Sequence, residues 1–221
     1  MKKKLTIASV LLAALPLSAQ NWSLGAGSGA FVFGDFVERT MRGPGSPDQP
    51  SVTTRLTLTA AVRAGLAVDI QHDFADRWGI RLEGAFTRAP LSIEDSSGDE
   101  FNIDAGELDV TTFMLPIIFR INRGGALRFH LLGGPAYAIY KPHGPQNADA
   151  SITVFEGSRS EWGAAAGAGA AWQLSDRFAI EGEITDIVTA SPFHREDFSS
   201  GSVKIPKPHN VHTKLGVRYR F

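Results

Sequence analysis

The chain has 221 residues, of which 43% are hydrophobic and 20% charged, and it contains 23 Gly, 12 Pro and no Cys. The lack of Cys excludes a disulfide scaffold, Cys-ligated zinc or iron–sulfur sites and a thiol nucleophile. The formal charge of −1 excludes the strongly basic domain of a typical nucleic-acid-binding protein, so we expect no nucleic-acid partner.

Residues 1–20 are interpreted as a signal peptide that is removed on export. Lys2 to Lys4 form a positive n-region, Leu5 to Leu17 an apolar segment, and Ser18-Ala19-Gln20 an end of small residues. The apolar segment has about 13 residues, fewer than the roughly 20 that a membrane-spanning helix needs. Without the three lysines, 19 basic and 23 acidic side chains remain, a net charge of −4. Residues 21–221 are then expected to form one exported domain.

After residue 20, apolar residues alternate with polar or small ones at a period of two, which is typical of β-strands with two different faces. Eight such segments follow in chain order: Trp22 to Phe33, Arg55 to Ile70, Trp78 to Thr87, Asp109 to Ile121, Leu127 to Tyr140, Glu161 to Gln173, Phe178 to Thr189 and His209 to Phe221. The alternation is clearest in His209 to Phe221, and it is also unbroken in Arg55 to Ile70, where every even-numbered residue is apolar. We therefore predict an all-β domain of eight strands.

The connections between these segments alternate in length. The short ones lie around His72 to Arg77, Asn122 to Ala126 and Leu174 to Asp176, and the long ones are Gly34 to Thr53, Arg88 to Leu108, Lys141 to Ser160 and Ala190 to Pro208. In an up-and-down meander, successive connections lie at opposite ends of the sheet. The pattern predicts an antiparallel transmembrane β-barrel with short periplasmic turns, four longer extracellular loops and both termini in the periplasm.

A soluble eight-stranded barrel would show the same period, with its apolar side inward. Two observations favour lipid outside. Small residues such as Gly163, Gly167 and Gly169 crowd the polar face, as a narrow lumen requires. Aromatic residues lie on the apolar face next to the short turns, where an aromatic girdle meets the membrane interface. The predicted girdle is Trp22, Trp78, Trp172, Phe178, Tyr219 and Phe221.

Charged residues fix which face is inward, because Arg or Lys on a lipid face near the midplane costs about 2–4 kcal/mol. The lumen of an eight-stranded barrel is just wide enough to be filled by side chains, and buried charges need partners. We therefore predict a lumen plugged by a network of ion pairs. Its members are Arg63, Asp69, Arg81, Glu83, Arg120, Arg128, Glu161, Glu181, Glu183, Lys214 and Arg218.

Three segments carry a resemblance to a known family: Met114-Leu115-Pro116-Ile117-Ile118-Phe119-Arg120, Leu131-Leu132-Gly133-Gly134-Pro135-Ala136-Tyr137 and the terminal Val217-Arg218-Tyr219-Arg220-Phe221. With them the chain resembles the small outer-membrane β-barrel proteins labelled porin-family or PorT-like, over nearly all of residues 21–221. The resemblance implies a location in the outer membrane among lipid and lipopolysaccharide. It also implies insertion by the barrel-assembly machinery, which reads the last strand and its terminal aromatic residue. It implies no particular activity.

Pro116 and Pro135 fall inside the fourth and fifth predicted strands. Because proline has no N–H to donate to a neighbouring strand, each predicts a bulge or a local loss of pairing.

No residue pattern indicates a catalytic or metal centre. His209 and His212 are three apart and would point to opposite faces of a strand, which disfavours joint ligation of a metal. A lipid-modifying outer-membrane enzyme would need a Ser, His and acid set, and the sequence offers no convincing one. We expect no enzyme activity, cofactor or metal. The predicted role is structural or surface-binding, with an unknown surface ligand, and the alternative is a narrow pore for small or hydrophobic solutes.

Overall fold

The computed structural model describes residues 21–42, 53–95, 102–122, 124–143, 157–197 and 202–221. The predicted signal peptide, residues 1–20, lies outside these ranges. The elements are β1 (Trp22–Phe33), β2 (Val37–Arg42), β3 (Thr53–Ala60), β4 (Arg63–Asp73), β5 (Trp78–Asp95), β6 (Asn102–Met114), β7 (Ile117–Arg120), β8 (Leu127–His143), β9 (Arg159–Gln173), β10 (Phe178–Thr189), the 3₁₀ helix η2 (Arg195–Asp197), β11 (Ser202–Lys204) and β12 (His209–Arg220).

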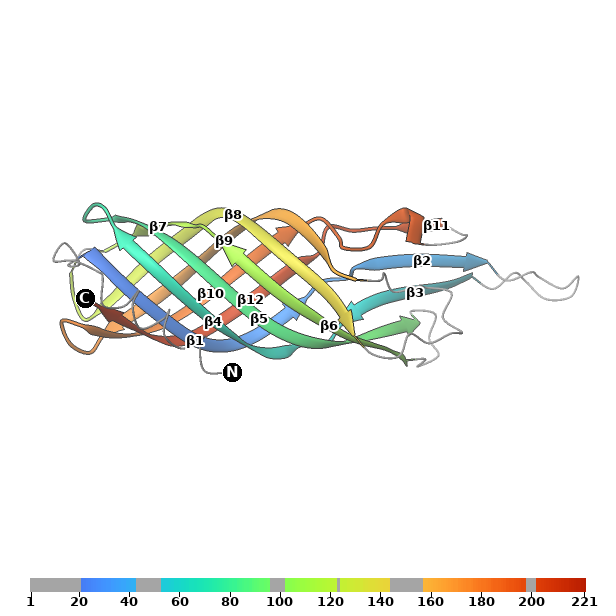
Figure 1. The fold of residues 1–221 in the computed structure, drawn as a ribbon, viewed down its shortest axis with the longest axis horizontal. Coiled ribbons are helices and arrows are strands. Elements are labelled where there is room, and N and C mark those ends of the chain that lie inside the picture. The colour runs from blue at the N-terminus through green and yellow to red at the C-terminus, as the bar shows by residue number, and fades with distance from the viewer. Residues whose placement is uncertain (1–20, 43–52, 96–101, 123, 144–156, 198–201) are drawn as a thin grey trace, which may run out of the picture.

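The strands close into an antiparallel barrel, and they are tilted against its long axis (Figure 1). Its wall has eight strand positions, here called staves, one of which is made of two strands in succession. The staves follow the chain as β1, β4, β5, β6 continued by β7, β8, β9, β10 and β12, and β12 pairs with β1 to close the cylinder. The predicted fold, an eight-stranded up-and-down barrel, is confirmed. Within the described ranges, no helix is long and apolar enough to cross a membrane.

Short turns join the staves at one end of the barrel, here called the turn end. The amides of Phe74 and Ala75 donate to the Trp78 carbonyl, both at 3.2 Å, and tie β4 to β5. The Asn122 side chain accepts from the Phe129 amide at 2.7 Å and bridges β7 to β8. Between β9 and β10, the Ser175 hydroxyl accepts from the Phe178 amide at 3.1 Å. Backbone hydrogen bonds hold the first of these turns, and polar side chains supply the hydrogen bonds in the other two.

At the opposite end, here called the extended end, the sheet continues beyond the barrel (Figure 1). β3 pairs with the second half of β5, β2 pairs with β3, and β11 pairs with β2. The predicted long connections are therefore partly strand. Two of these strands, β2 and β11, have only six and three residues and were not predicted from the sequence.

The prediction of one unbroken strand from Arg55 to Ile70 is wrong. Leu58 lies opposite Ile93 of β5, whereas Leu66 lies opposite Phe86, so one extra residue has entered the register between β3 and β4. Such a bulge turns the following residues to the other face of the sheet. Leu58 is fully buried as a result, whereas Leu66 is 65% exposed on the outer wall.

The two prolines behave differently. The predicted interruption occurs at Pro116, because β6 ends at Met114 and β7 begins at Ile117. At Pro135 the strand itself is not interrupted, since β8 runs through this residue and pairs it with Ala164 of β9. The predicted loss of pairing occurs on its other side, where the ladder with β6 ends at Ala136 and the ladder with β7 begins at Gly133. The Pro135 carbonyl accepts from the Leu115 amide at 3.1 Å. The proline's missing donor therefore faces the gap between β6 and β7, where no ladder partner needs it.

Candidate functional site

Inward-facing residues on five staves, β4, β5, β8, β10 and β12, form a layer of ionisable groups across the lumen, here called the charged layer. Side chains alternate along each strand, so every second one points inward and its neighbours face out. Ile184, for example, is 53% exposed between buried Glu183 and Thr185. On β12, Leu215 is 66% exposed beside buried Lys214. The layer consists of Asp69, Arg81, Glu83, His130, Glu181, Glu183, Lys214 and Arg218.

Arg81 lies at the centre of the charged layer and is only 1% exposed. Its Nη2 lies 2.7 Å from Glu181 Oε1 and its Nη1 lies 2.6 Å from Glu183 Oε2. Its Nε and Nη2 also donate to Gln71 Oε1 at 3.1 and 3.0 Å. A guanidinium with a carboxylate at each end of its fork is held in one orientation. It thereby links β5 to β10 across the lumen.

The other two cations of the layer complete the pairing of the carboxylates. Lys214 Nζ lies 2.5 Å from Glu83 Oε2 and 3.3 Å from Asp69 Oδ2. Arg218 Nη2 lies 2.8 Å from Asp69 Oδ1 and 2.7 Å from Glu181 Oε2. Each of the four carboxylates thus has at least one cation within ion-pair distance, as burial of a charge requires.

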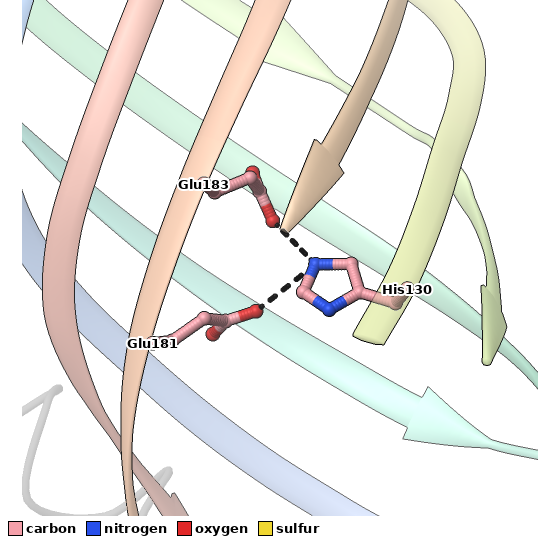
Figure 2. Close-up of side chains that lie close together, drawn as sticks. All are labelled: His130, Glu181 and Glu183. Atoms are coloured by element: carbon pink, nitrogen blue, oxygen red, sulfur yellow. Dashed lines mark hydrogen bonds and ion pairs between the residues drawn. The ribbon is translucent and has the colours of Figure 1, made fainter. Parts of the chain in front are cut away.

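His130 reaches this layer from β8, across β9 (Figure 2). Its Nε2 lies 3.0 Å from Glu183 Oε2 and 3.5 Å from Glu181 Oε1. The path is open because residue 169 on β9 is glycine: a Cβ there would lie 2.6 Å from the His130 ring. On β1, Gly25 makes room for Asp69 in the same way. Small residues on two staves therefore leave space for large polar ones on their neighbours.

His130, Glu181 and Glu183 are the one group of potential metal ligands found among the described residues, with three ligand atoms within 4.8 Å of one another. Both carboxylates, however, already bind the Arg81 guanidinium at 2.7 and 2.6 Å. A metal cation would lie next to this buried positive charge and compete with it for the same oxygens. The arrangement is therefore that of an ion-pair network rather than a metal centre.

The lumen becomes apolar toward the extended end. The buried side chains there, here called the apolar layer, are Phe31, Phe33, Phe36, Val37, Leu58, Ala60, Ala67, Ala85, Ala89, Leu91, Ile93, Ala105, Leu108, Val110, Ala138, Tyr140, Phe193 and Val203. The Phe36 ring lies 5.8 Å from the Phe193 ring and 6.1 Å from the Tyr140 ring. This layer was not predicted from the sequence, which indicated charged side chains along the lumen.

His212 lies where the two layers meet. Its ring stacks on Phe31 of the apolar layer, with 4.1 Å between the ring centroids. Its Nδ1 lies 3.9 Å from Glu83 Oε1. His209, three residues earlier, is exposed and its Nδ1 lies 2.8 Å from Asp186 Oδ2. The two histidines thus lie in different environments, as their spacing predicts.

The remaining predicted lumen residues lie outside the charged layer. Arg63 is exposed beside the bulge that begins β4. Glu161 lies near the extended end of β9, 3.5 Å from His194. Arg120 and Arg128 lie at the turn end, where Arg120 forms an ion pair with Asp73. The predicted set is therefore divided among three levels of the barrel.

Sequence reasoning missed four residues that touch these clusters: Gln71, Asp73, His130 and Arg220. His130 has the same inward parity as Arg128, two residues earlier, and could have been found by extending the alternation. Gln71 and Asp73 come shortly after the predicted segment that ends at Ile70, and Arg220 is next to the end of the last predicted segment.

Five of the six predicted girdle residues lie on staves at the turn end, and Phe221 directly follows β12 there. Three of them, Trp78, Trp172 and Phe178, are 44 to 56% exposed. Their rings meet neighbouring aromatic residues: Trp78 is 4.8 Å from Phe119, and Phe178 is 5.0 Å from Tyr219. Toward the other end, Trp162 is 73% exposed and lies 4.8 Å from Tyr137. Sequence reasoning did not identify this second aromatic site.

Trp162 and Trp172 lie ten positions apart on β9. At a rise of about 3.3 Å per residue and a tilt of about 40°, they are separated by about 25 Å along the barrel axis, which equals the height of the apolar band on outer-membrane barrels. Exposed side chains between these levels are apolar on several staves, including Leu66, Leu82 and Leu131. Such a continuous exposed apolar surface marks contact with lipid.

The outer wall is hollowed where β6 gives way to β7. An apolar cavity of about 490 Å³ lies there, lined by Leu82, Phe113, Met114, Leu115, Pro135, Ala136, Tyr137 and Trp162. Met114 and Ala136 are almost fully buried within the wall. The cavity is thus a dent in the lipid-facing surface beside the strand interruption at Pro116.

Comparison with known proteins agrees with this description. A family model described as "Outer membrane protein beta-barrel domain" matches residues 5–221. The search of curated proteins gives no match. Among solved structures, the chain is similar to the outer membrane protein OprG from Pseudomonas aeruginosa, with 15% identity, a TM-score of 0.63 and coverage of 92% of this chain and 96% of OprG.

Two further structures show the same fold. Neisserial surface protein A is 8% identical, with a TM-score of 0.52 and coverage of 90% of this chain and 97% of that protein. The outer membrane protein AlkL, determined in DMPC lipid bilayers, is 12% identical, with a TM-score of 0.52 and 94% of each chain covered. At these identities the likeness concerns the fold alone.

Proposed function

Because this chain belongs to the outer membrane protein β-barrel domain family and is a multi-pass protein of the outer membrane, we propose that it is a closed barrel with a structural or surface-binding role. Filling of the lumen supports this proposal. Arg81 and Lys214, with their carboxylates, cross the lumen at one level, and Phe36, Tyr140 and Phe193 fill it at another. Eight strands leave little further space inside.

The proposal includes an orientation and a set of partners. The turn end faces the periplasm, and the extended end, where β2, β3 and β11 continue the sheet (Figure 1), lies outside the cell and carries the four predicted loops. Outer-membrane lipid and lipopolysaccharide surround the apolar band. The barrel-assembly machinery inserts the chain. This step is supported by the family resemblance, which is carried in part by Val217-Arg218-Tyr219-Arg220-Phe221. The protein acts through its loops and the projecting sheet and performs no catalysis.

A narrow pore for small or hydrophobic solutes is the competing function. One observation favours it, the apolar cavity of about 490 Å³ in the outer wall beside Pro116. A solute would have to pass the charged layer or leave through this wall. In the first route it must break ion pairs between side chains that are at most about one-tenth exposed.

Conductance across a planar bilayer tests the closed barrel against the pore. We expect purified protein to insert without steady ion-conducting steps, and regular steps would contradict the closed barrel. A liposome assay with a small hydrophobic solute covers transport that carries no current, and uptake above protein-free liposomes would also contradict it. Lipid A from expressing cells should give an unchanged mass spectrum. An altered profile would indicate a lipid-modifying enzyme instead.

A further inference from the structure

The turn end of the lumen opens into a cavity with an unusual concentration of arginines. The cavity has a volume of about 350 Å³, which is within the range of about 300–1,000 Å³ for small-molecule sites. Its wall includes Arg120, Arg128 and Arg220, here called the arginine cluster, together with Asp73 and Asp76. Their positions on β7, β8 and β12 are the inward positions nearest the short turns.

One carboxylate is shared between two members of the arginine cluster. Asp73 forms an ion pair with Arg120, and its Oδ2 lies 3.7 Å from Arg220 Nη2. Asp73 Oδ1 also accepts a hydrogen bond from Gln71 at 2.7 Å. Asp76 is exposed in the turn after β4, where water screens its charge. Among the described residues that line the cavity, Asp73 is therefore the one carboxylate in contact with an arginine.

Arg128 lacks a carboxylate partner of its own. Within the ranges that the structure describes, it forms no ion pair, and its buried Nε has no hydrogen-bond partner. It lines both this cavity and a smaller one of about 50 Å³ that continues inward to Arg81, His130 and Glu181. In the charged layer, by contrast, Arg81 and Arg218 each contact at least two carboxylates.

We propose that the arginine cluster binds a small dianionic oxyanion of the phosphate or phosphate-monoester class, with Arg128 as its main contact. A guanidinium offers parallel N–H donors that match two oxygens of a phosphate. The cluster has three guanidinium groups, and Asp73, which pairs with two of them, balances one positive charge. The two charges that remain match a dianion. Arg220 is 37% exposed, so the cluster is accessible from the solution at the turn end.

The test compares purified, folded barrels in detergent micelles, with inorganic phosphate as the probe at constant ionic strength. We expect phosphate to raise the thermal unfolding midpoint of the parent, because a ligand that binds only the folded state stabilises it. In Arg128→Gln we expect at least a tenfold loss of phosphate affinity by calorimetry and loss of this midpoint shift. Without phosphate, Arg128→Gln should unfold at the same or a higher temperature than the parent, because repulsion among the arginines is relieved.

Arg177→Gln is the matched control, because Arg177 is an exposed arginine in the neighbouring turn that lines neither cavity. It should keep the full response to phosphate. Arg128→Lys retains the charge without the fork and should show an intermediate affinity. Acetate, a monoanion, should bind less tightly than phosphate. Binding of glycerol 3-phosphate would identify a lipid-derived headgroup as a source, and its failure beside phosphate binding would identify the free ion.

Equal responses of the parent and Arg128→Gln to phosphate would overturn the proposal. So would a phosphate response no larger than that to chloride at the same ionic strength. If Arg128→Gln does not fold, Arg220→Gln replaces it, and an unchanged phosphate affinity in that variant would also count against the site. These results are independent of whether the barrel conducts ions.

Discussion

The charged layer and the apolar layer fill the same lumen by different physical means. In the charged layer, Arg81 and Lys214 are held by specific oxygens at 2.5 to 2.7 Å. In the apolar layer, Phe36 and Leu58 are buried by non-directional packing. Removal of one ionic partner leaves an uncompensated charge, whereas truncation of an apolar side chain leaves a cavity. The two layers should therefore fail differently when residues are changed.

The largest effect is expected at the centre of the charged layer. Arg81→Ala removes the guanidinium that lies 2.7 Å from Glu181 and 2.6 Å from Glu183, and loss of one partner of a buried pair costs about 3–5 kcal/mol. We expect the free energy of unfolding to fall by about 4 kcal/mol, measured by denaturant titration in lipid vesicles. Arg88→Ala is the control, because Arg88 pairs with Asp109 at 2.5 Å but is 51% exposed. If both variants have the same free energy of unfolding as the parent, the charged layer contributes little to stability.

The apolar layer should respond with a somewhat smaller loss. Leu58→Ala removes a fully buried side chain of β3, and such truncations cost about 2–5 kcal/mol. We expect about 3 kcal/mol, with the same value at neutral and mildly acidic pH, because no ionisable group is removed. The measurement is again denaturant unfolding. Leu66→Ala, on the outer wall, is the control and should cost less, since Leu66 is 65% exposed to lipid. Equal losses would argue against a packed apolar layer.

Substitutions at Gly169 and Gly182 distinguish steric overlap inside the lumen from the effect of replacing a glycine in a strand. Gly169→Ala places a Cβ 2.6 Å from the His130 ring and should destabilise the barrel by about 1–3 kcal/mol through overpacking. Gly182→Ala on the adjacent strand is the control, because a Cβ there meets no atom within 4 Å. The temperature at which each variant loses its compact mobility on gels gives a direct comparison. Two variants with the same transition temperature would contradict tight filling around His130.

The smallest effect concerns an ion pair outside both layers, at the extended end. Two hydrogen bonds from Arg159, at 2.5 and 2.6 Å, lower the pKa of Asp197 below its ordinary value. Since the folded-state pKa is the lower one, the stabilisation is complete above the unfolded-state value of about 3.9. It is lost as the pH falls through the folded-state pKa. We expect about 0.5 kcal/mol after solvent screening, and Asp197→Asn should remove it.

Measurement of the Asp197 effect requires the same unfolding titration at pH 6 and below pH 3. The difference between parent and Asp197→Asn should be present at the higher pH and vanish at the lower one. A difference that grows on acidification would show that the sign of this linkage is wrong.

The sequence predicted the residues of the charged layer better than their surroundings. Glu181 and Glu183 alternate with Gly182 and Ile184, so parity and the cost of charge in lipid place them inward without further information. The apolar layer could not be found in this way. Its residues occupy inward positions, yet in a one-dimensional pattern an inward Leu58 and an outward Leu66 look the same.

The bulge between β3 and β4 is the reason that Leu58 and Leu66 cannot be told apart from the sequence. Even-numbered residues are apolar on both sides of Ala61 and Val62, so the change of face leaves no mark in the periodicity. The arginine cluster was equally hidden. Asp73 and Arg220 lie far apart in the sequence, and only closure of the barrel brings β4 and β12 to the two sides of β1.

Pairing of β1 with β12 joins the first and last strands that the structure describes, with Ser23 opposite Arg220. This seam has a kinetic consequence. Contacts between residues so distant in sequence form slowly, and until they form, the nascent sheet has two open edges whose amides and carbonyls can template aggregation. The barrel therefore closes only when these two strands meet, and protection of both edges until then favours productive assembly.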